Sequence, residues 1–206
     1  MSEFIESELV ELTLPDPRLP NPDNLSYYIL EKERKIYLET GICPDVLTIQ
    51  RMIFRWNMED RGKEKEARKP ITIYIMSYGG DLDYMWTLVD TIKLSTTPII
   101  TVNVGVAASA ASLIFVAGHR RLMMPNAKVI IHEGSASVQG DAVKVVDATE
   151  SYKKELKRMK EFILEQTRIP ATTLNRRKNN DWTIDAHYCL ANGVCDQVIE
   201  SLDDIL

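Results

Sequence analysis

The chain carries no formally charged residue between Lys93 and Arg120. A helix that crosses a bilayer needs about 20 apolar residues, so this stretch must be buried either in a membrane or in a protein core. Threonines, an asparagine and a proline dilute its first half, and Gly105 separates that half from an Ala/Ser-rich second half. The pattern therefore favours a strand over 99–104, a tight turn at Gly105 and a buried helix over a membrane span.

The same order of strand, turn and helix precedes this stretch. Residues 35–38 predict a short strand, and Asp45 can cap the helix that follows. Residues 70–76 alternate as a strand, 77–80 break it, and Asp81 begins another helix. The repetition implies right-handed crossovers and a largely parallel α/β sheet whose strands end in functional turns.

The remaining segments set the domain organisation. Residues 1–26 contain four prolines and predict an irregular arm. At 206 residues and 45% apolar composition, the rest, 27–206, predicts one domain with one core. The run 59–69 mixes both charges without apolar residues and predicts a solvated loop. Residues 139–168 predict a long helix with a narrow apolar seam, packed either on its own sheet or between subunits.

Composition excludes several classes of function. A net charge of −5 and a pI near 5.3 argue against a nucleic-acid surface. The acidic N-terminus lacks the basic and apolar regions of a secretory signal, which favours a cytoplasmic protein without a membrane partner. Three scattered cysteines, Cys43, Cys189 and Cys195, predict reduced structural thiols, and the absence of a C-x-x-C pair argues against a metal site.

Three residues could form a hydrolytic triad. Ser109 stands among very small residues just after a β-branched run, His132 lies in a second such run, and Asp181 comes later. The order Ser, His, Asp differs from that of chymotrypsin-like, subtilisin-like and α/β-hydrolase enzymes. Alternatives remain open: Ser109 as a packing residue with Ser112 as the nucleophile, His132 as a core histidine, and Asp185 in place of Asp181.

Several short motifs resemble those of the ClpP family, the proteolytic subunit of the Clp protease, from about Glu33 to the C-terminus. They are Glu33-Arg34, Ile36-Tyr-Leu38, Gly41, Ser77-Tyr-Gly-Gly80, Gly105-x-Ala-Ala-Ser109, Ala117-Gly118, Met124-Pro-Asn-Ala127, Val129-Ile-Ile-His132, Gln139-Gly140 and Gly193-Val-Cys-Asp196. Each motif is short, but their order and spacing cover most of the chain. The resemblance implies a crotonase-like α/β fold of repeated β-β-α units in a superhelix, with a long handle helix at about 139–168.

The resemblance also implies roles for individual residues. Ser109 would be the nucleophile, His132 the general base, and Asp181 the group that orients His132. The backbone N–H groups of Gly80 and Ala110 would form the oxyanion hole. The polypeptide substrate would lie as an extended strand against a set of neighbouring small residues, Gly79, Gly134 and Ser135.

The implied protein is a serine endopeptidase that cleaves unfolded polypeptides and needs no cofactor. By the same resemblance it forms a homo-oligomer of stacked rings, heptameric in this family, that encloses the active sites and can work with an AAA+ ATPase. The chain departs from the family pattern at Tyr78, Val106 and Glu133-Gly134, which bears on substrate preference and turnover.

Three other interpretations remain open. The chain could be a non-catalytic ClpP-like subunit with a structural role in a ring. It could be an acyl-CoA enzyme of the crotonase type, which shares the fold and uses backbone oxyanion donors. A Ser-Lys dyad formed with Lys128 is a variant of the peptidase interpretation.

Overall fold

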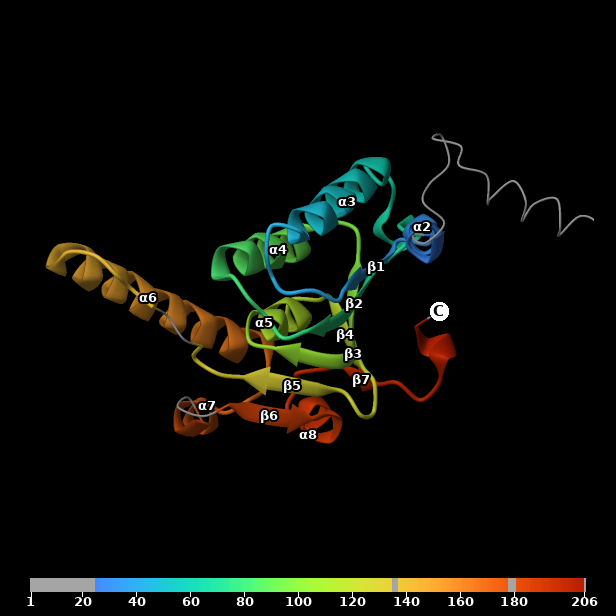
Figure 1. Ribbon diagram of the computed structural model, residues 1–206. Coiled ribbons are helices and arrows are strands. Elements are labelled where there is room, and N and C mark those ends of the chain that lie inside the picture. The colour runs from blue at the N-terminus through green and yellow to red at the C-terminus, as the bar shows by residue number, and fades with distance from the viewer. Residues whose placement is uncertain (1–24, 135–136, 178–180, 206) are drawn as a thin grey trace, which may run out of the picture.

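The computed structural model describes residues 25–134, 137–177 and 181–205, which form a seven-stranded sheet with helices packed around it (Figure 1). The strands are β1 (Lys35–Leu38), β2 (Ile71–Ser77), β3 (Ile99–Ala108), β4 (Arg120–Met123), β5 (Lys128–Ile131), β6 (Trp182–Asp185) and β7 (Gln197–Val198). The helices are α2 (Leu25–Lys32), α3 (Val46–Glu59), α4 (Leu82–Leu94), α5 (Ala110–Val116), α6 (Ala142–Gln166), α7 (Ala171–Arg177) and α8 (Ala186–Ala191), with 3-10 turns η2 (Lys65–Ala67) and η3 (Leu202–Asp204).

The sheet is largely parallel, as predicted. Its main path is β1-β2-β3-β4-β7, and every neighbouring pair on it is parallel. Strand β5 also pairs with β3 in parallel, whereas β6 runs antiparallel to β5. This arrangement confirms the α/β fold class. It also brings the ends of β3 and β5 to one edge of the sheet, where Ser109 and His132 follow these strands.

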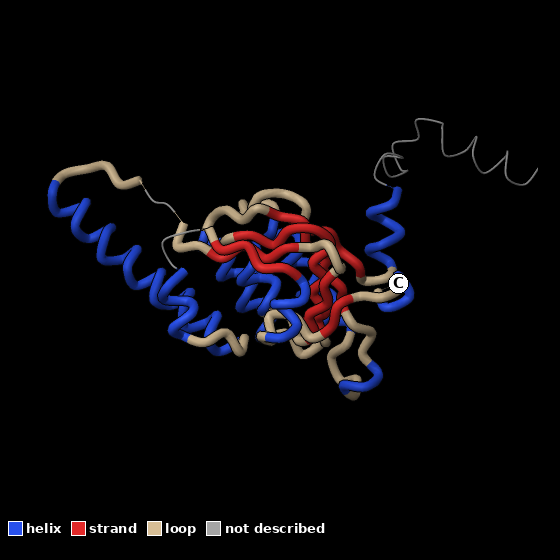
Figure 2. The backbone as a smooth tube through the Cα atoms, turned by 90° about the horizontal axis from the view of Figure 1, so that it is seen from below, coloured by secondary structure: helices blue, strands red, loops and turns tan. Residues whose placement is uncertain are grey.

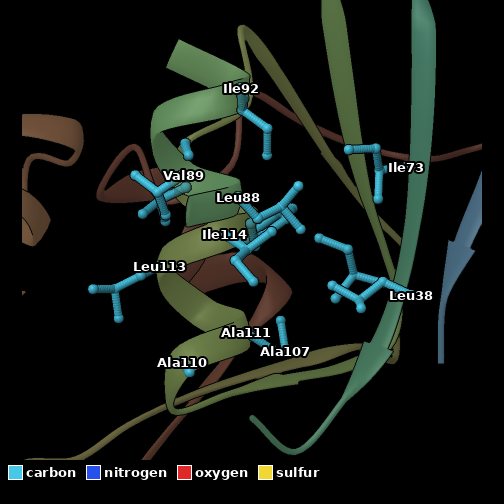
Figure 3. Packing of buried hydrophobic residues seen from close by; sticks show 14 of the residues in the cluster. Leu38, Ile73, Leu88, Val89, Ile92, Ala107, Ala110, Ala111, Leu113 and Ile114 are labelled. Atoms are coloured by element: carbon cyan, nitrogen blue, oxygen red, sulfur yellow. The ribbon is translucent and has the colours of Figure 1, made fainter. Parts of the chain in front are cut away.

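The uncharged stretch forms a strand and a helix in the core, as predicted. All seven residues of α5 are buried, and α5 packs beside α4 (Figure 3). Leu88 of α4 and Ile114 of α5 point toward Ile73 of β2. No helix within the described residues is long and apolar enough to cross a membrane.

The turn predicted at Gly105 is wrong, because β3 continues through it to Ala108. Strand β3 changes its neighbour here, from β4 up to Asn103 to β5 from Val106. The buried Asn103 amide spans the change: its Nδ2 donates to the Lys128 carbonyl (2.9 Å), and its Oδ1 accepts from Gly105 N–H (3.1 Å). Gly105 lies close to the side chain of Met76, since a Cβ at 105 would be 2.5 Å from its sulfur and would require this methionine to shift.

The long helix is confirmed as α6, which begins three residues after the predicted start and ends two residues before the predicted end. It extends away from the sheet (Figures 1 and 2). Its buried residues, Met159 and Ile163, are near its C-terminal end, whereas Val143 and Val146 are 68% and 60% exposed. The subunit's own core therefore covers the C-terminal part of the helix and leaves valines of the first turns in solvent.

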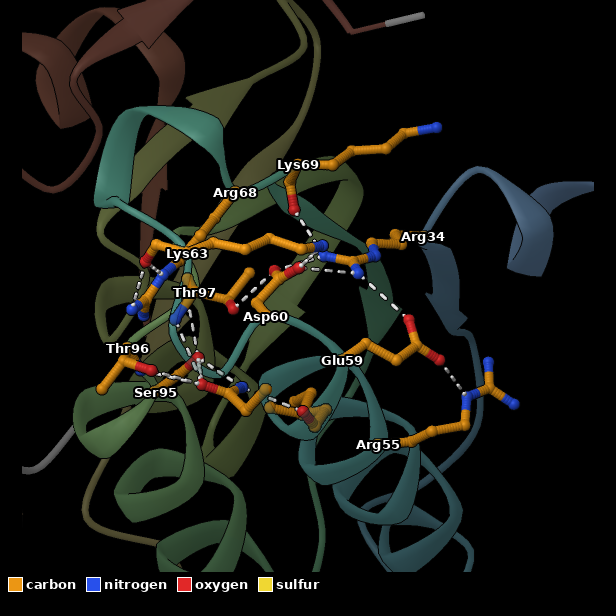
Figure 4. Close-up of polar contacts among 12 residues, drawn as sticks. Arg34, Arg55, Glu59, Asp60, Lys63, Arg68, Lys69, Ser95, Thr96 and Thr97 are labelled. Carbon is orange, nitrogen blue, oxygen red and sulfur yellow. Dashed lines mark hydrogen bonds and ion pairs between the residues drawn. The ribbon is translucent and has the colours of Figure 1, made fainter.

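The charged run 59–69 is not simply a solvated loop. Asp60 is fully buried and accepts hydrogen bonds from Arg34 (2.6 and 3.1 Å), Lys63 (2.7 Å) and Thr97 (2.9 Å) (Figure 4). The Arg34 guanidinium, with Lys63 and Thr97, holds the pKa of the Asp60 carboxyl well below its usual range despite burial. The prediction failed because Arg34, the partner of Asp60, lies far away in the sequence, and the run itself has no large apolar residue to indicate burial.

Two helix starts also differ from the predictions. Helix α2 begins at Leu25, inside the segment predicted to be irregular, while residues 1–24 of that arm lie outside the described range. The Asp45 side chain makes no capping hydrogen bond to α3, because its backbone is already helical. Asp81 does cap α4 as predicted, accepting from the N–H groups of Asp83 and Tyr84.

Candidate active site

Ser109 occupies a strained turn between β3 and α5. Its φ of 54° and ψ of −127° lie in a region that residues other than glycine rarely adopt. Its N–H donates to the Ile130 carbonyl of β5 (2.8 Å), and its side chain does not cap the helix. Such a strand-to-helix turn directs a serine hydroxyl out of the fold rather than into the helix.

The loop after β2 packs directly against this turn. A Cβ at Gly79, which has a φ of +96°, would lie 2.7 Å from the Cβ of Ser109. A Cβ at Gly80 would overlap the backbone of Ile42. The N–H of Ile42 donates to the Gly79 carbonyl (2.9 Å), and the N–H of Asp81 donates to the Ile42 carbonyl (2.8 Å). Both glycines are therefore required by close approach, one to the turn and one to the neighbouring backbone.

Two backbone N–H groups beside Ser109 have no hydrogen-bond partner in the part of the chain that the structure describes. Ala110 is the first residue of α5, so its N–H has no partner within the helix. The bridge between Ile42 and Gly80 is parallel and uses the carbonyl of Gly79 and the N–H of Asp81, which leaves the Gly80 N–H directed away from Ile42. Within the described residues neither N–H donates a hydrogen bond. A Cβ at Gly79 would lie 3.0 Å from Ala110 N, so both donors flank the same turn.

His132 and Asp181 come together through the antiparallel pairing of β5 and β6. The register pairs Ile131, the last residue of β5, with Trp182, the first residue of β6. His132 directly follows this pair on one strand, and Asp181 directly precedes it on the other. Nδ1 of His132 lies 3.4 Å from Oδ1 of Asp181, and the two side chains are 32% and 80% exposed. Asp185 lies at the far end of β6 and caps α8 by accepting from the N–H of Tyr188. The geometry favours Asp181 as the partner of His132.

Ser109 lies at the same edge of the sheet as His132. The parallel register pairs Ala108 of β3 with Ile130 of β5, so Ser109 is one residue beyond this pair and His132 two residues beyond it. Among the described residues, no hydrogen bond joins Ser109 Oγ to His132. Catalytic hydrogen bonds are often long or absent in enzymes without substrate. The structure thus brings the three candidates to one edge and connects two of them.

The alternatives to Ser109 as nucleophile and to His132 as base are placed less favourably. Ser112 is buried, and its hydroxyl donates to the Ser109 carbonyl (2.6 Å). Lys128 lies at the opposite end of β5 from His132. All three cysteines are free, as predicted; burial raises the pKa of Cys189, and that of Cys195 to about 11. These two thiols are protonated at neutral pH and are not nucleophiles.

A cavity of about 240 Å³ opens beside His132, between the end of β5 and helices α6 and α7. Its apolar lining consists of Ile131, Leu156, Met159, Ile163, Leu174 and Trp182. Charged side chains that also line it are Glu133, Lys157, Lys160 and Arg177. The sequence pattern predicted the apolar seam of the long helix. It did not predict the cavity, because the other walls are residues of β5, α7 and β6 that pack beside this seam in the fold.

Tyr152 connects the long helix to the segment that follows His132. Its hydroxyl donates to the Glu133 carbonyl (2.7 Å). A Cβ at Gly134 would lie 3.2 Å from this hydroxyl oxygen of Tyr152. Burial, with the nearby charge of Glu133, raises the pKa of Tyr152. The motifs did not predict this contact, since no motif includes Tyr152. Gly134 is in place beside the site, whereas Ser135 lies outside the described residues.

Together these features describe an α/β protein with a largely parallel sheet. At one edge of this sheet lie a serine on a strained strand-to-helix turn, two backbone N–H groups that can act as donors, and a His-Asp pair. The family model described as Clp protease matches residues 24–202, and the chain belongs to this family. The resemblance drawn from the motifs is thereby confirmed.

Curated relatives carry the same designation. "ATP-dependent Clp protease proteolytic subunit 2" of Treponema denticola is 32% identical over 145 residues, which cover 68% of this chain and 70% of the relative. The protein of the same name from Treponema pallidum is 27% identical over 139 residues (66% and 70%). "ATP-dependent Clp protease proteolytic subunit" of Dehalococcoides mccartyi is 28% identical over 178 residues (84% and 86%).

Proposed function

We propose that this chain is a serine endopeptidase subunit that cleaves unfolded polypeptides with Ser109, His132 and Asp181. The observation that carries the proposal is the strained turn, which presents a serine hydroxyl between two free backbone N–H groups. Membership of the Clp protease family supports a peptidase.

In the proposed reaction, Ser109 Oγ attacks the scissile carbonyl while Nε2 of His132 accepts its proton. Asp181, at 3.4 Å from Nδ1, favours the tautomer in which Nδ1 carries the hydrogen and stabilises the imidazolium that forms. The N–H groups of Gly80 and Ala110 donate to the developing oxyanion. His132 then gives the proton to the leaving amine, and water releases the acyl group by the same steps.

Proton transfer requires Ser109 Oγ and His132 Nε2 to lie about 2.6–3.2 Å apart. Since the described residues show no such hydrogen bond, we expect the side chain of Ser109 or His132 to change its orientation when substrate binds or subunits assemble. An extended substrate would run between Gly79 and Gly134, with Ser135 as a further contact. The cavity beside His132 would take an apolar side chain.

The family generally forms rings and works with a Clp ATPase, and we extend both properties to this chain. The exposed valines Val143 and Val146 on α6 support a contact between subunits along this helix. Stacked heptameric rings, an AAA+ partner and a cytoplasmic location remain proposals from the family and the composition.

The nucleophile is tested by intact mass after treatment with a fluorophosphonate probe. Wild type should gain one adduct, and Ser109→Ala should gain none. Ser112→Ala is the matched control and should still gain one adduct, because its hydroxyl is buried. An adduct on Ser109→Ala, or none on folded and assembled wild type, would contradict the proposal.

One observation favours a second candidate, a non-catalytic ring subunit: Ser109 and His132 are not hydrogen-bonded in the isolated chain. Addition of Clp relatives as ring partners distinguishes the two possibilities. A catalytic subunit should react with the probe once a ring forms. A structural subunit should enter the ring and stay unlabelled.

Gly79→Ala should lower peptide cleavage by roughly 100-fold. The new Cβ would push the Ser109 turn away from its position, and a displacement of about 1 Å at a reacting group can cost this much. Gly62→Ala is the control, since Gly62 has a similar φ of +83° but no atom within 4 Å of an added Cβ. It should cost about 1–2 kcal/mol of stability and leave kcat unchanged. Equal kcat values for both variants would contradict the close contact.

Tyr152→Phe should lower kcat about fivefold, which corresponds to one neutral hydrogen bond of about 1 kcal/mol. The substitution removes only the hydroxyl that holds the Glu133 carbonyl beside His132. Tyr74→Phe is the matched control, because the Tyr74 hydroxyl also donates to a backbone carbonyl, that of Ile205 (2.6 Å), away from the site. Steady-state kinetics that show the same kcat for both variants would contradict a positioning role for Tyr152.

A further inference from the structure

A large groove lies at the opposite end of β3 from Ser109. It has a volume of about 1160 Å³ and is formed by η2, the end of α4, the starts of β3 and β4, and the end of α6. Ile99 and Ile100, the first residues of β3, line it, whereas Ser109 follows the last residue of that strand. The groove is therefore separate from the candidate active site.

Positive charge predominates in this groove. Four cationic side chains line it without a carboxylate partner among the described residues: Lys65, Arg68, Lys93 and Arg120. Three of them donate to neutral oxygens instead. Arg68 donates to the Lys63 carbonyl (2.9 and 3.0 Å), Lys93 to the Gln166 side chain (2.9 Å) and Arg120 to the Gln197 side chain (2.6 Å).

Negative charge in the groove is sparse. Asp196 is paired with Arg121 (2.5 Å), so Glu165 is the lining carboxylate left without an ion pair within the described residues. The chain as a whole has a net charge of −5, and the groove thus has the opposite sign to the rest of the protein. Local concentration of one charge sign in a concave surface attracts ligands of the other sign.

The pKa of His119 is affected by the positive charge in this groove. After burial, the largest causes that lower its pKa are the charges of Lys93 and Lys65. Its Nδ1 accepts from the N–H of Ile99 (3.0 Å), which leaves Nε2 as the donor of the neutral ring. A hydrogen bond from the ring to the backbone of Ile92 partly offsets the lowering of the pKa. What His119 contributes to the argument is therefore the positive charge around it.

We propose that this groove, the basic groove, docks an acidic, partly apolar segment of a partner protein. Its cations would pair with Glu or Asp side chains, and Pro70, Pro98 and Ile100 supply apolar surface for intervening residues. Single-stranded nucleic acid is a poorer fit, because among the described residues no Phe, Tyr or Trp lines the groove for base stacking, and Glu165 would repel a phosphate. This surface goes beyond the proposed cleavage reaction and does not depend on it.

The test is fluorescence anisotropy of the full chain with a fluorescein-labelled 12-residue peptide of alternating Glu and Leu. Wild type should bind at low salt and lose affinity between about 50 and 150 mM salt, within the range over which the Debye length falls to about 8 Å. The double variant Lys65→Glu/Lys93→Glu should bind at least tenfold more weakly. The neutral variant Lys65→Gln/Lys93→Gln should fall between the two.

A matched control changes the same amount of charge elsewhere. Lys153→Glu/Lys154→Glu on α6 should bind the peptide as wild type does. Circular dichroism of every variant should match wild type. Equal weakening in the control, unchanged binding in the groove variant, or tighter binding of a labelled oligouridine than of the peptide at 150 mM salt would overturn the proposal.

Discussion

Peptide cleavage by Ser109→Ala is expected to be about 10⁴- to 10⁶-fold slower than by wild type. Alanine removes the attacking oxygen while the free N–H groups of Gly80 and Ala110 remain, so only binding and oxyanion stabilisation would be left. The turn should tolerate alanine, because the Ser109 side chain makes no capping hydrogen bond. The measurement is hydrolysis of fluorogenic peptides by the assembled protein, with kcat and KM determined separately.

Three further variants sharpen this test. His132→Ala should lose about as much activity as Ser109→Ala, because nucleophile and base act as a unit. Asp181→Asn should lose less, since its carboxylate is 80% exposed and lies 3.4 Å from Nδ1. Ser112→Ala should keep wild-type kcat. Full activity of Ser109→Ala, or a loss in Ser112→Ala as large, would reject the proposed nucleophile.

The second large effect concerns stability and is independent of catalysis. Asp60→Asn should lower the free energy of unfolding by about 3–5 kcal/mol, because it leaves the buried guanidinium of Arg34 with only the half-exposed carboxylate of Glu59 as a charged partner. Urea unfolding at a fixed protein concentration measures the difference. Glu59→Gln is the control, since Glu59 contacts the same Arg34 (3.1 Å) but is 48% exposed. It should change the free energy of unfolding by no more than about 1 kcal/mol, and equal effects of the two variants would contradict the role of burial.

The ion pair between Asp60 and Arg34 also predicts how the free energy of unfolding depends on pH. The pKa of Asp60 is lower in the folded chain than the value of about 3.9 expected when unfolded. Its contribution to stability is therefore complete above that unfolded value and is lost as the pH falls through the folded pKa. The difference in unfolding free energy between wild type and Asp60→Asn should be constant from pH 7 to about 5 and shrink below about pH 4. A difference that grows toward acid would contradict this assignment.

Local patterns in the sequence predicted elements better than turns. The uncharged stretch indicated a buried strand and helix because apolar residues and small side chains report burial directly. The turn at Gly105 was misplaced because glycine also marks sites of close approach within a strand. Here the close neighbour is Met76, on the adjacent strand, and only the pairing of β2 with β3 reveals it.

The sequence alone determined the alternation of strands and helices through β1, α3, β2, α4, β3 and α5, the long helix, the family and the three candidate catalytic residues, because motifs and periodicity are local properties of the chain. Tertiary structure alone decided which groups meet. It buried Asp60 against Arg34, attached Tyr152 to the segment beside His132, and gathered the cations of the basic groove from η2, α4 and β4. These contacts join residues that are distant in the sequence, and no local pattern of charge or hydrophobicity specifies a partner that only strand pairing and helix packing bring close.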